Sequence, residues 1–126
     1  MRRLVLLVIT TSICLGCYDQ MKHTKEAVLR DELFTLRQTI DQFTQDQQHA
    51  PESLGDLVAH GYMRTVPKDP FTESELTWQV IYGEFTPAPE DTPAVPPHDI
   101  QNLRGIIDVH SGSDRIATDG TRYRDW

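Results

Sequence analysis

The chain has 126 residues, which is enough for one small domain and too few for two separate hydrophobic cores. Its formal net charge is −7, and its lysines and arginines are scattered along the sequence. Because phosphate binding needs clustered Lys and Arg, this composition argues against nucleic acid as a partner.

The N-terminus determines the expected compartment. Two arginines at positions 2 and 3 precede an apolar run over residues 4–15, and small residues follow. A positive start, about a dozen apolar residues and a small residue at the end are typical of a secretory signal peptide. The run is short for a membrane-spanning helix, which needs ~20 apolar residues. We therefore expect residues 1–16 to be a signal peptide and the chain to be exported.

The end of this segment, Leu15-Gly16-Cys17, resembles a bacterial lipoprotein box, although Cys14 stands where such boxes usually carry Leu. The resemblance predicts that Cys17 is acylated and becomes the first residue of the mature chain, with a plain signal peptide or a retained short anchor as the alternative. Removal of residues 1–16 takes away two positive charges and no acid, so the formal charge falls from −7 to −9. It leaves Cys17 as the single cysteine, which argues against a disulfide framework and against a catalytic thiol.

The next segment predicts one long helix from Tyr18 to about Gln47, because it contains no Gly or Pro and its apolar residues recur every three to five positions. Residues 17–27 lack the apolar stripe and are expected to form a helical stalk. Glu26 and Arg30 are spaced for an i,i+4 ion pair. The packed domain is expected to cover residues 28–126. The apolar stripe consists of Val28, Leu29, Leu33, Leu36, Ile40 and Phe43.

A shorter helix is expected to begin near Pro51, since the missing N–H of proline is harmless at a first helical position. Gly61 stands where a left-handed C-cap is expected. Two prolines within Val66–Phe71 should keep that segment extended.

The remaining elements are strands. Residues 76–82 predict a strand with Trp78 and Val80 on one face, and the proline-rich, acidic residues 84–99 predict an exposed irregular loop. A second strand is expected over residues 105–110 and a short third one within 115–123. One long helix packed on a small antiparallel sheet is an α+β arrangement.

The tail after the second strand contains Asp114 and Asp119 among serines, threonines and glycines. Oxygen ligands on a tight loop suit a hard cation such as calcium. The alternative is a solvated turn whose Asp and Ser side chains cap their own backbone, and no EF-hand spacing is present.

Four segments occur in a distinctive order: Leu36–Asp46, Ala50–Val58, Gly61-Tyr62-Met63 and Pro67-Lys68-Asp69-Pro70-Phe71. In this order they resemble the major pseudopilins of type II secretion, the subunits known as protein G. The likeness covers residues 28–126, and its most distinctive piece is Pro67–Phe71. The tail is also similar, because in that family a strand ends in Ser-x-Gly-x-Asp and leads into a calcium loop.

The resemblance implies a pilin-like α+β fold and a calcium site with Asp114 and Asp119 as ligands, together with the backbone near Ser111. The chain departs from the family at its N-terminus. Gly16-Cys17 follows the apolar run instead of preceding it, and the fifth mature residue is Met21 where the family has Glu. A prepilin peptidase is not expected to process this chain, and the mature protein lacks the apolar helix that packs into a pilus core.

The resemblance therefore predicts a non-enzymatic, membrane-tethered subunit of a type II secretion or related filament system, facing the periplasm. Its expected partners are other secretion or pilin-like proteins and, through the lipid anchor, the membrane, with no small-molecule substrate. One alternative is a free-standing envelope lipoprotein that uses the pseudopilin fold to bind a protein. Another is an enzyme built on Asp108, His110, Ser111 and Asp114, but adjacent strand residues such as His110 and Ser111 point to opposite faces.

Overall fold

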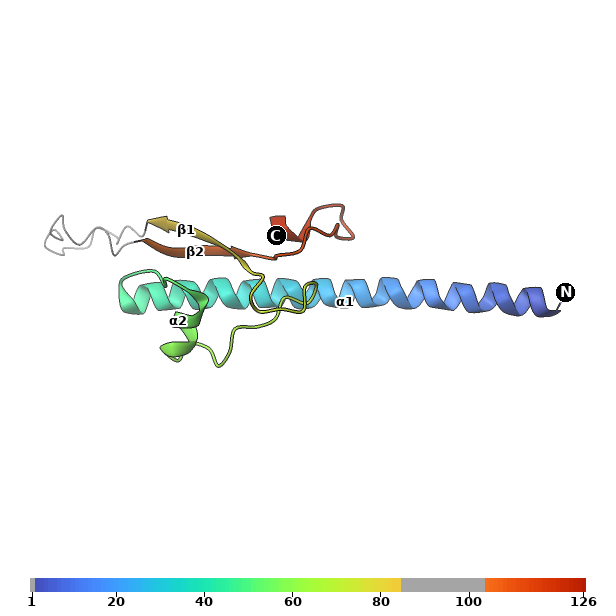
Figure 1. Cartoon of the computed structure of the whole chain (residues 1–126), viewed down its shortest axis with the longest axis horizontal. Helices are drawn as coiled ribbons and strands as arrows, with labels where there is room; N and C mark the ends of the chain where they lie inside the picture. The colour runs from blue at the N-terminus through green and yellow to red at the C-terminus, as the bar shows by residue number, and fades with distance from the viewer. Residues whose placement is uncertain (1, 85–103) are drawn as a thin grey trace, which may run out of the picture.

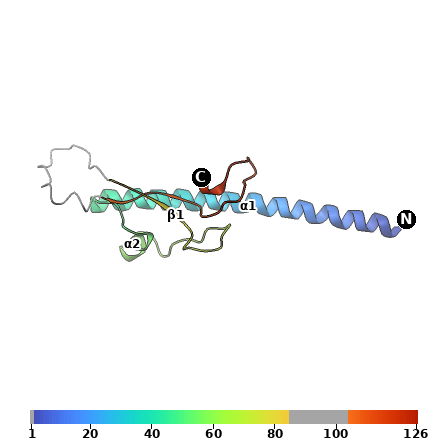
Figure 2. The same ribbon diagram turned by 45° about the horizontal axis from the view of Figure 1, so that its top comes forward.

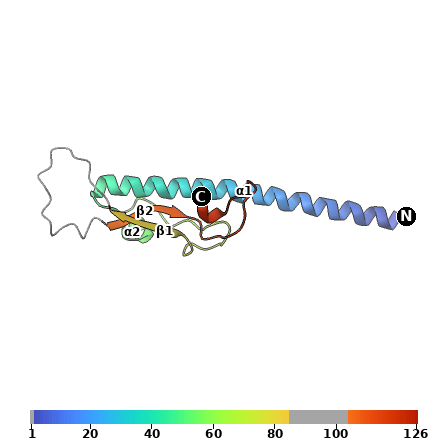
Figure 3. The ribbon, with the colours of Figure 1, turned by 90° about the horizontal axis from the view of Figure 1, so that it is seen from above.

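The computed structural model describes residues 2–84 and 104–126, with side chains from Gln20 onward. A long helix, α1 (Arg2–Gln47), runs the length of the molecule, and the other elements lie along its C-terminal half (Figure 1). These are helix α2 (Leu54–Ala59), strands β1 (Gln79–Glu84) and β2 (Arg104–His110), and a short 3-10 helix, η2 (Tyr123–Asp125). The N-terminal part of α1 projects beyond them in every view (Figures 2 and 3). The α+β class is confirmed.

The apolar stripe of α1 forms one side of the core. Leu29, Leu33, Leu36, Ile40 and Phe43 are almost fully buried, whereas Val28 is 43% exposed. Val28 precedes Leu29 and lies about 100° from it around the helix, which turns it away from the sheet. The expectation that Val28 belongs to the stripe was therefore wrong.

The helix is longer at its N-terminal end than expected, and its contacts with the domain begin earlier. It ends at Gln47 as predicted, but it begins at Arg2 instead of Tyr18. Lys25 already contacts Glu73, and Glu26 is buried, so the last residues of the predicted 17–27 stalk belong to the packed domain. The predicted Glu26–Arg30 pair is replaced by other contacts, because Glu26 faces inward and Arg30 lies over the ring of Trp126, 4.1 Å from its centroid.

The sheet has two antiparallel strands, and β2 packs on α1 through Ile106 and Val109. Val80 pairs with Val109 and Tyr82 with Ile106, with a bulge after Ile81. The second strand was predicted within one residue.

The first strand begins later than predicted, at Gln79, because the residues before it make other contacts. Leu76 is 88% exposed. Trp78 is buried and donates from Nε1 to the carbonyl of Pro67, 2.8 Å away. Trp78 therefore belongs to the core, but it precedes the strand in which it was predicted.

The shorter helix also begins later than expected, at Leu54 instead of Pro51. The carboxylate of Asp56 accepts from the backbone N–H of Ser53 at 2.9 Å, which caps the helix one turn further on. Pro51 is buried, and its carbonyl accepts from Ile106 of β2 at 2.7 Å. Gly61 has φ +79°, which confirms the left-handed turn after this helix.

The expected third strand is a single isolated bridge between Ile116 and Arg122. The chain turns sharply at Gly120, whose φ is +88°, and enters η2 directly afterwards. This segment is long enough to close one turn but too short to form a ladder of paired strand residues. The loop predicted over residues 84–99 lies outside the described residues, except for Glu84 at the end of β1.

Candidate functional site

The residues predicted to hold calcium lie on the segment that follows β2, and each has a protein partner. Ser111 is buried, and its hydroxyl donates to the carboxylate of Asp69 at 2.5 Å. Asp114 is exposed and accepts from Arg124 at 2.6 Å, with Arg122 4.0 Å away.

Asp119 forms a turn with its own neighbour. Its carboxylate accepts from the backbone N–H of Thr121 at 2.9 Å and from the hydroxyl of Thr121 at 2.6 Å. These hydrogen bonds lower the pKa of the Asp119 carboxyl. This is the pattern of an Asp that caps its own backbone, which was the alternative to a metal ligand.

This arrangement is not a ready-made calcium shell. Calcium takes about 6–8 oxygen ligands, and among the described residues no three or more His, Cys, Asp or Glu side chains gather as a metal site. The guanidinium groups beside Asp114 occupy the position where a cation would bind. Calcium would have to displace Arg124 from Asp114 before it could bind this carboxylate, so we assign no role to a metal at this loop.

A buried carboxylate, which the sequence indicated only as a partner of Arg30, joins α1 to the tail. Glu26 is 1% exposed and accepts three hydrogen bonds. Thr118 donates from its backbone N–H at 2.8 Å and from its hydroxyl at 2.6 Å, and Tyr123 donates from its hydroxyl at 2.8 Å. Burial alone raises the pKa of Glu26, but these donors outweigh it and hold the pKa below its ordinary value.

Tyr123 completes this contact on its apolar side. It is fully buried, and its ring stacks on Phe71 with centroids 3.8 Å apart. Burial and the Glu26 carboxylate raise the pKa of the Tyr123 hydroxyl. An acid on a helix normally indicates an exposed face. The one signal in the sequence is spacing, because Glu26 stands three residues before Leu29, where the apolar stripe would continue.

A second buried carboxylate, Asp69, lies within Pro67–Phe71. It accepts from the backbone N–H groups of Phe71 and Thr72 at 2.8 and 3.3 Å, which forms the turn. Its other oxygen accepts from Ser111 and from the N–H of Gly112 at 3.1 Å. A Cβ at Gly112 would collide with the carbonyl of Thr77, so only glycine allows this approach.

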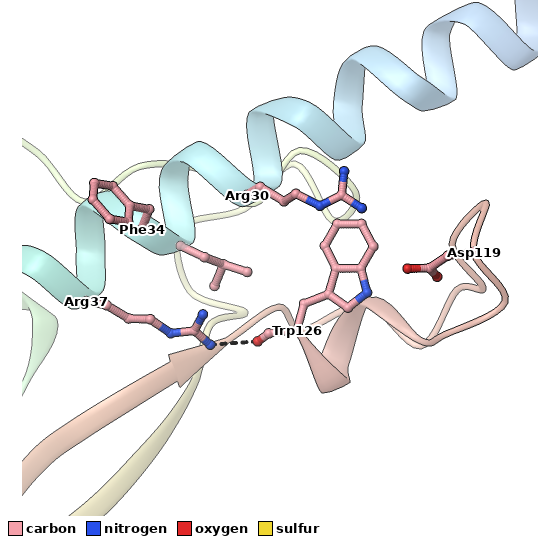
Figure 4. A pocket seen from close by; sticks show the side chains of 6 residues that line it. Arg30, Phe34, Arg37, Asp119 and Trp126 are labelled. Carbon is pink, nitrogen blue, oxygen red and sulfur yellow. Dashed lines mark hydrogen bonds between the residues drawn. The ribbon is translucent and has the colours of Figure 1, made fainter.

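A third polar cluster surrounds Arg37 of α1, partly visible in Figure 4. Its guanidinium donates to Asp108 at 2.7 Å and to the carbonyls of Val109 and Trp126 at 2.9 and 2.6 Å. His110 lies 3.4 Å from Asp108, as predicted for two residues on one strand face. Partial burial raises the pKa of Asp108, but Arg37 and His110 together hold it below its ordinary value.

The enzyme constellation considered from the sequence is not assembled. Asp108 and His110 lie together, but Ser111 donates to Asp69 and Asp114 pairs with Arg124. The hydroxyl of Ser111 is therefore directed at Asp69, while Nδ1 of His110 lies 2.8 Å from the backbone oxygen of Trp126, so this serine and this histidine do not form the nucleophile–base pair that the constellation requires.

A groove of about 320 Å³ lies between α1 and the tail (Figure 4). Arg30, Phe34, Arg37, Asp119 and Trp126 line it with Leu33. The cations in this groove are occupied, because Arg37 makes three hydrogen bonds and Arg30 covers Trp126.

The last predicted site residue, Cys17, lies within α1 among residues whose side chains are not described. No protein-family model, curated protein or solved structure matches the chain. Fold and contacts together define an α+β protein in which one buried carboxylate, Glu26, fastens the tail to a long helix and another, Asp69, joins two loops to each other.

Proposed function

We propose that this chain is a non-enzymatic, pseudopilin-like subunit of a type II secretion or related filament system, tethered to the membrane through Cys17 and facing the periplasm. The observation that carries the proposal is the contact between Asp69 and the Ser111-Gly112 turn. These segments are two of the pieces that resemble protein G, and they are 42 residues apart in the sequence. Their direct contact makes the resemblance one connected feature instead of two separate matches.

The shape of the molecule supports a tethered subunit. Within the described residues, the loops and the sheet lie along the part of α1 that follows about Lys22, and the N-terminal part of the helix projects beyond them (Figure 1). Within the described residues no helix combines the length and the apolar character needed to cross a membrane. Acylation of Cys17 would place the attachment on this projecting part.

The proposal assigns no reaction to the chain. Among the described residues, His23 lies 3.7 Å from the buried Glu26 and His110 lies 3.4 Å from Asp108. Arg37 holds the second pair in the interface between α1 and β2. This cluster holds β2 against α1, and its side chains are already paired with one another.

The tether can be tested by metabolic labelling with palmitate. We expect label on the wild-type chain and none on Cys17→Ala. Absence of label from the wild type, or label that survives in Cys17→Ala, rules out the lipid anchor.

The assembly can be tested by photo-crosslinking in cells from position 34. Phe34 is 65% exposed on α1, so a photoreactive residue there faces whatever packs beside the helix. We expect adducts with pilin-like or secretion-system proteins. The same residue at position 76, in the exposed loop before β1, is the control and should give fewer such adducts.

The alternative is a free-standing envelope lipoprotein that uses this fold to bind another protein. It is favoured by the absence of an apolar segment after Cys17, since five of the ten residues 18–27 are charged or histidine: Asp19, Lys22, His23, Lys25 and Glu26. An adduct from position 34 with an unrelated envelope protein, and none with secretion components, would establish this alternative.

A further inference from the structure

The edge of the domain from which α1 projects carries a second surface feature, which we call the rim site. It consists of two adjoining concavities of about 350 and 100 Å³ that share Lys22, Phe71 and Arg115. Its remaining side chains are those of Met21, Lys25, Ile116 and Tyr123.

The rim site combines cations with exposed apolar groups. No carboxylate of the described part of the chain lines either concavity, and neither Lys22 nor Arg115 pairs with a described acid. Lys25 has a long contact of 3.4 Å with the exposed Glu73. Met21 is 63% exposed and Ile116 is 50% exposed.

The position of these cations is unusual for a chain this acidic. The formal net charge is −7, so an anionic surface repels the molecule as a whole. Glu26, one turn after Lys22 on the same helix, is buried and accepts three hydrogen bonds from the tail. Lys22 is half-buried and Arg115 is exposed, and neither forms a direct ion pair with an acid of the described part of the chain.

The rim site also lies close to the expected membrane surface. Lys22 follows Cys17 by five residues, which is about 7.5 Å along a helix. This is within a Debye length of about 8 Å at physiological ionic strength. Cations this close to an anionic leaflet are attracted to it. Asp19 lies closer still to Cys17 in the sequence and offsets part of this attraction, so the attraction depends on Lys22, Lys25 and Arg115 together.

We propose that the rim site binds the headgroup of an acidic phospholipid in the membrane that holds the tether, with Lys22 and Arg115 on the phosphate and Met21 and Ile116 against the acyl region. This inference rests on the membrane attachment proposed above. Its consequence is orientation: a lipid-anchored domain on a single helix could tilt freely, and a headgroup contact at the rim fixes which face points toward the membrane.

The test measures how fast a water-soluble acylating reagent modifies each lysine, by mass spectrometry of the full chain. The chain is reconstituted into vesicles of phosphatidylcholine alone or mixed with phosphatidylglycerol. We expect Lys22 to react several-fold more slowly when phosphatidylglycerol is present. Lys68, which is exposed outside the rim site, is the internal control and should react equally in both.

Variants then identify the site. Arg115→Gln should remove most of the protection of Lys22, since each cation near an anionic surface contributes about a fivefold change in affinity. Arg64→Gln removes the same charge at an exposed position outside the rim site and should leave the protection unchanged.

A second arm separates this inference from the tether. The full chain in neutral detergent is mixed with short-chain phosphatidylglycerol, short-chain phosphatidylcholine or inorganic phosphate. Protection of Lys22 by phosphatidylglycerol alone supports the rim site even if palmitate labelling fails. Equal protection by phosphatidylcholine or by inorganic phosphate, or no protection in either arm, overturns the proposal.

Discussion

The hydroxyl of Tyr123 donates to the carboxylate of Glu26 across 2.8 Å, although the two residues are 97 positions apart in the sequence. Both side chains are almost fully buried. A hydrogen bond to a buried charged group contributes about 1.5–3 kcal/mol. This bond fixes the tail on α1 at the point where the helix leaves the domain.

We expect Tyr123→Phe to lower the free energy of unfolding by about 2 kcal/mol, because it leaves the ring on Phe71 and removes one donor from a buried carboxylate. Urea unfolding measures the change. Tyr82→Phe is the matched control, since the hydroxyl of Tyr82 donates to the carbonyl of Glu52 at an exposed site. It should cost less than about 0.5 kcal/mol, and equal losses in the two variants would contradict this role for Tyr123.

Stability should fall on acidification in a way that depends on Glu26. Its folded pKa is lowered, so the unfolded state binds more protons, and the stability it contributes is complete above the ordinary carboxyl pKa of about 4. That contribution is lost as pH falls through the lowered, folded pKa. Unfolding measured from pH 7 to acid should show a shallower slope in Glu26→Gln than in the wild type.

Glu32, on the same helix, provides the control of opposite sign. Partial burial and Asp31 raise its pKa, so its charged form is disfavoured in the folded state. The stability linked to Glu32 is present at low pH and is lost as pH rises through its folded pKa. Glu32→Gln should therefore leave the acid slope attributed to Glu26 in place, and equal slopes in wild type and Glu26→Gln would refute the assignment.

Asp69 should be one of the most sensitive positions in the chain. Asp69→Ala leaves the hydroxyl of Ser111 and the N–H of Gly112 without their acceptor, and it also removes the acceptor of the turn at Phe71. We expect a loss of about 3–5 kcal/mol, which is typical when a buried hydrogen-bond network is broken. Ser111→Ala removes one donor only and should cost about 1–2 kcal/mol.

A double-mutant cycle distinguishes a direct contact from two separate effects. Because Asp69 and Ser111 touch, the double variant should be less destabilised than the sum of the single variants. Asp46→Ala is the control, since Asp46 accepts from Tyr62 at an exposed site and should not couple to Ser111. Additive losses for Asp69 and Ser111 would contradict the contact that carries the proposed function.

The parts of the fold that follow from local patterns could be predicted from the sequence. The apolar spacing of Leu29, Leu33 and Leu36 gave the buried face of α1, and the Gly and Pro signals gave the end of α1 and the turn at Gly61. The first residue of a helix or strand was predicted less accurately where a contact with a distant segment determines it. Pro51 is excluded from its helix because its carbonyl bonds to Ile106.

The polar contacts could not be predicted, because their partners are far apart in the sequence. Glu26 finds Thr118 and Tyr123 only after the tail has folded back on the helix. Asp114 and Asp119 were predicted as calcium ligands because acids among small residues are typical of cation-binding loops. The same residue types also form self-capped turns, and residue type alone does not separate the two.

The calcium predicted from the resemblance can be measured directly. If Asp114 and Asp119 hold the ion, calcium raises the melting temperature of the wild type relative to chelator, because a ligand bound only to the folded state stabilises it. Asp114→Ala should then lose the rise. Arg124→Gln sharpens the test, since it frees the carboxylate that Arg124 occupies at 2.6 Å and should enlarge the response to calcium. A shift that is equal in the wild type and in Asp114→Ala, or absent from all three proteins, leaves this loop as the self-capped turn that its contacts describe.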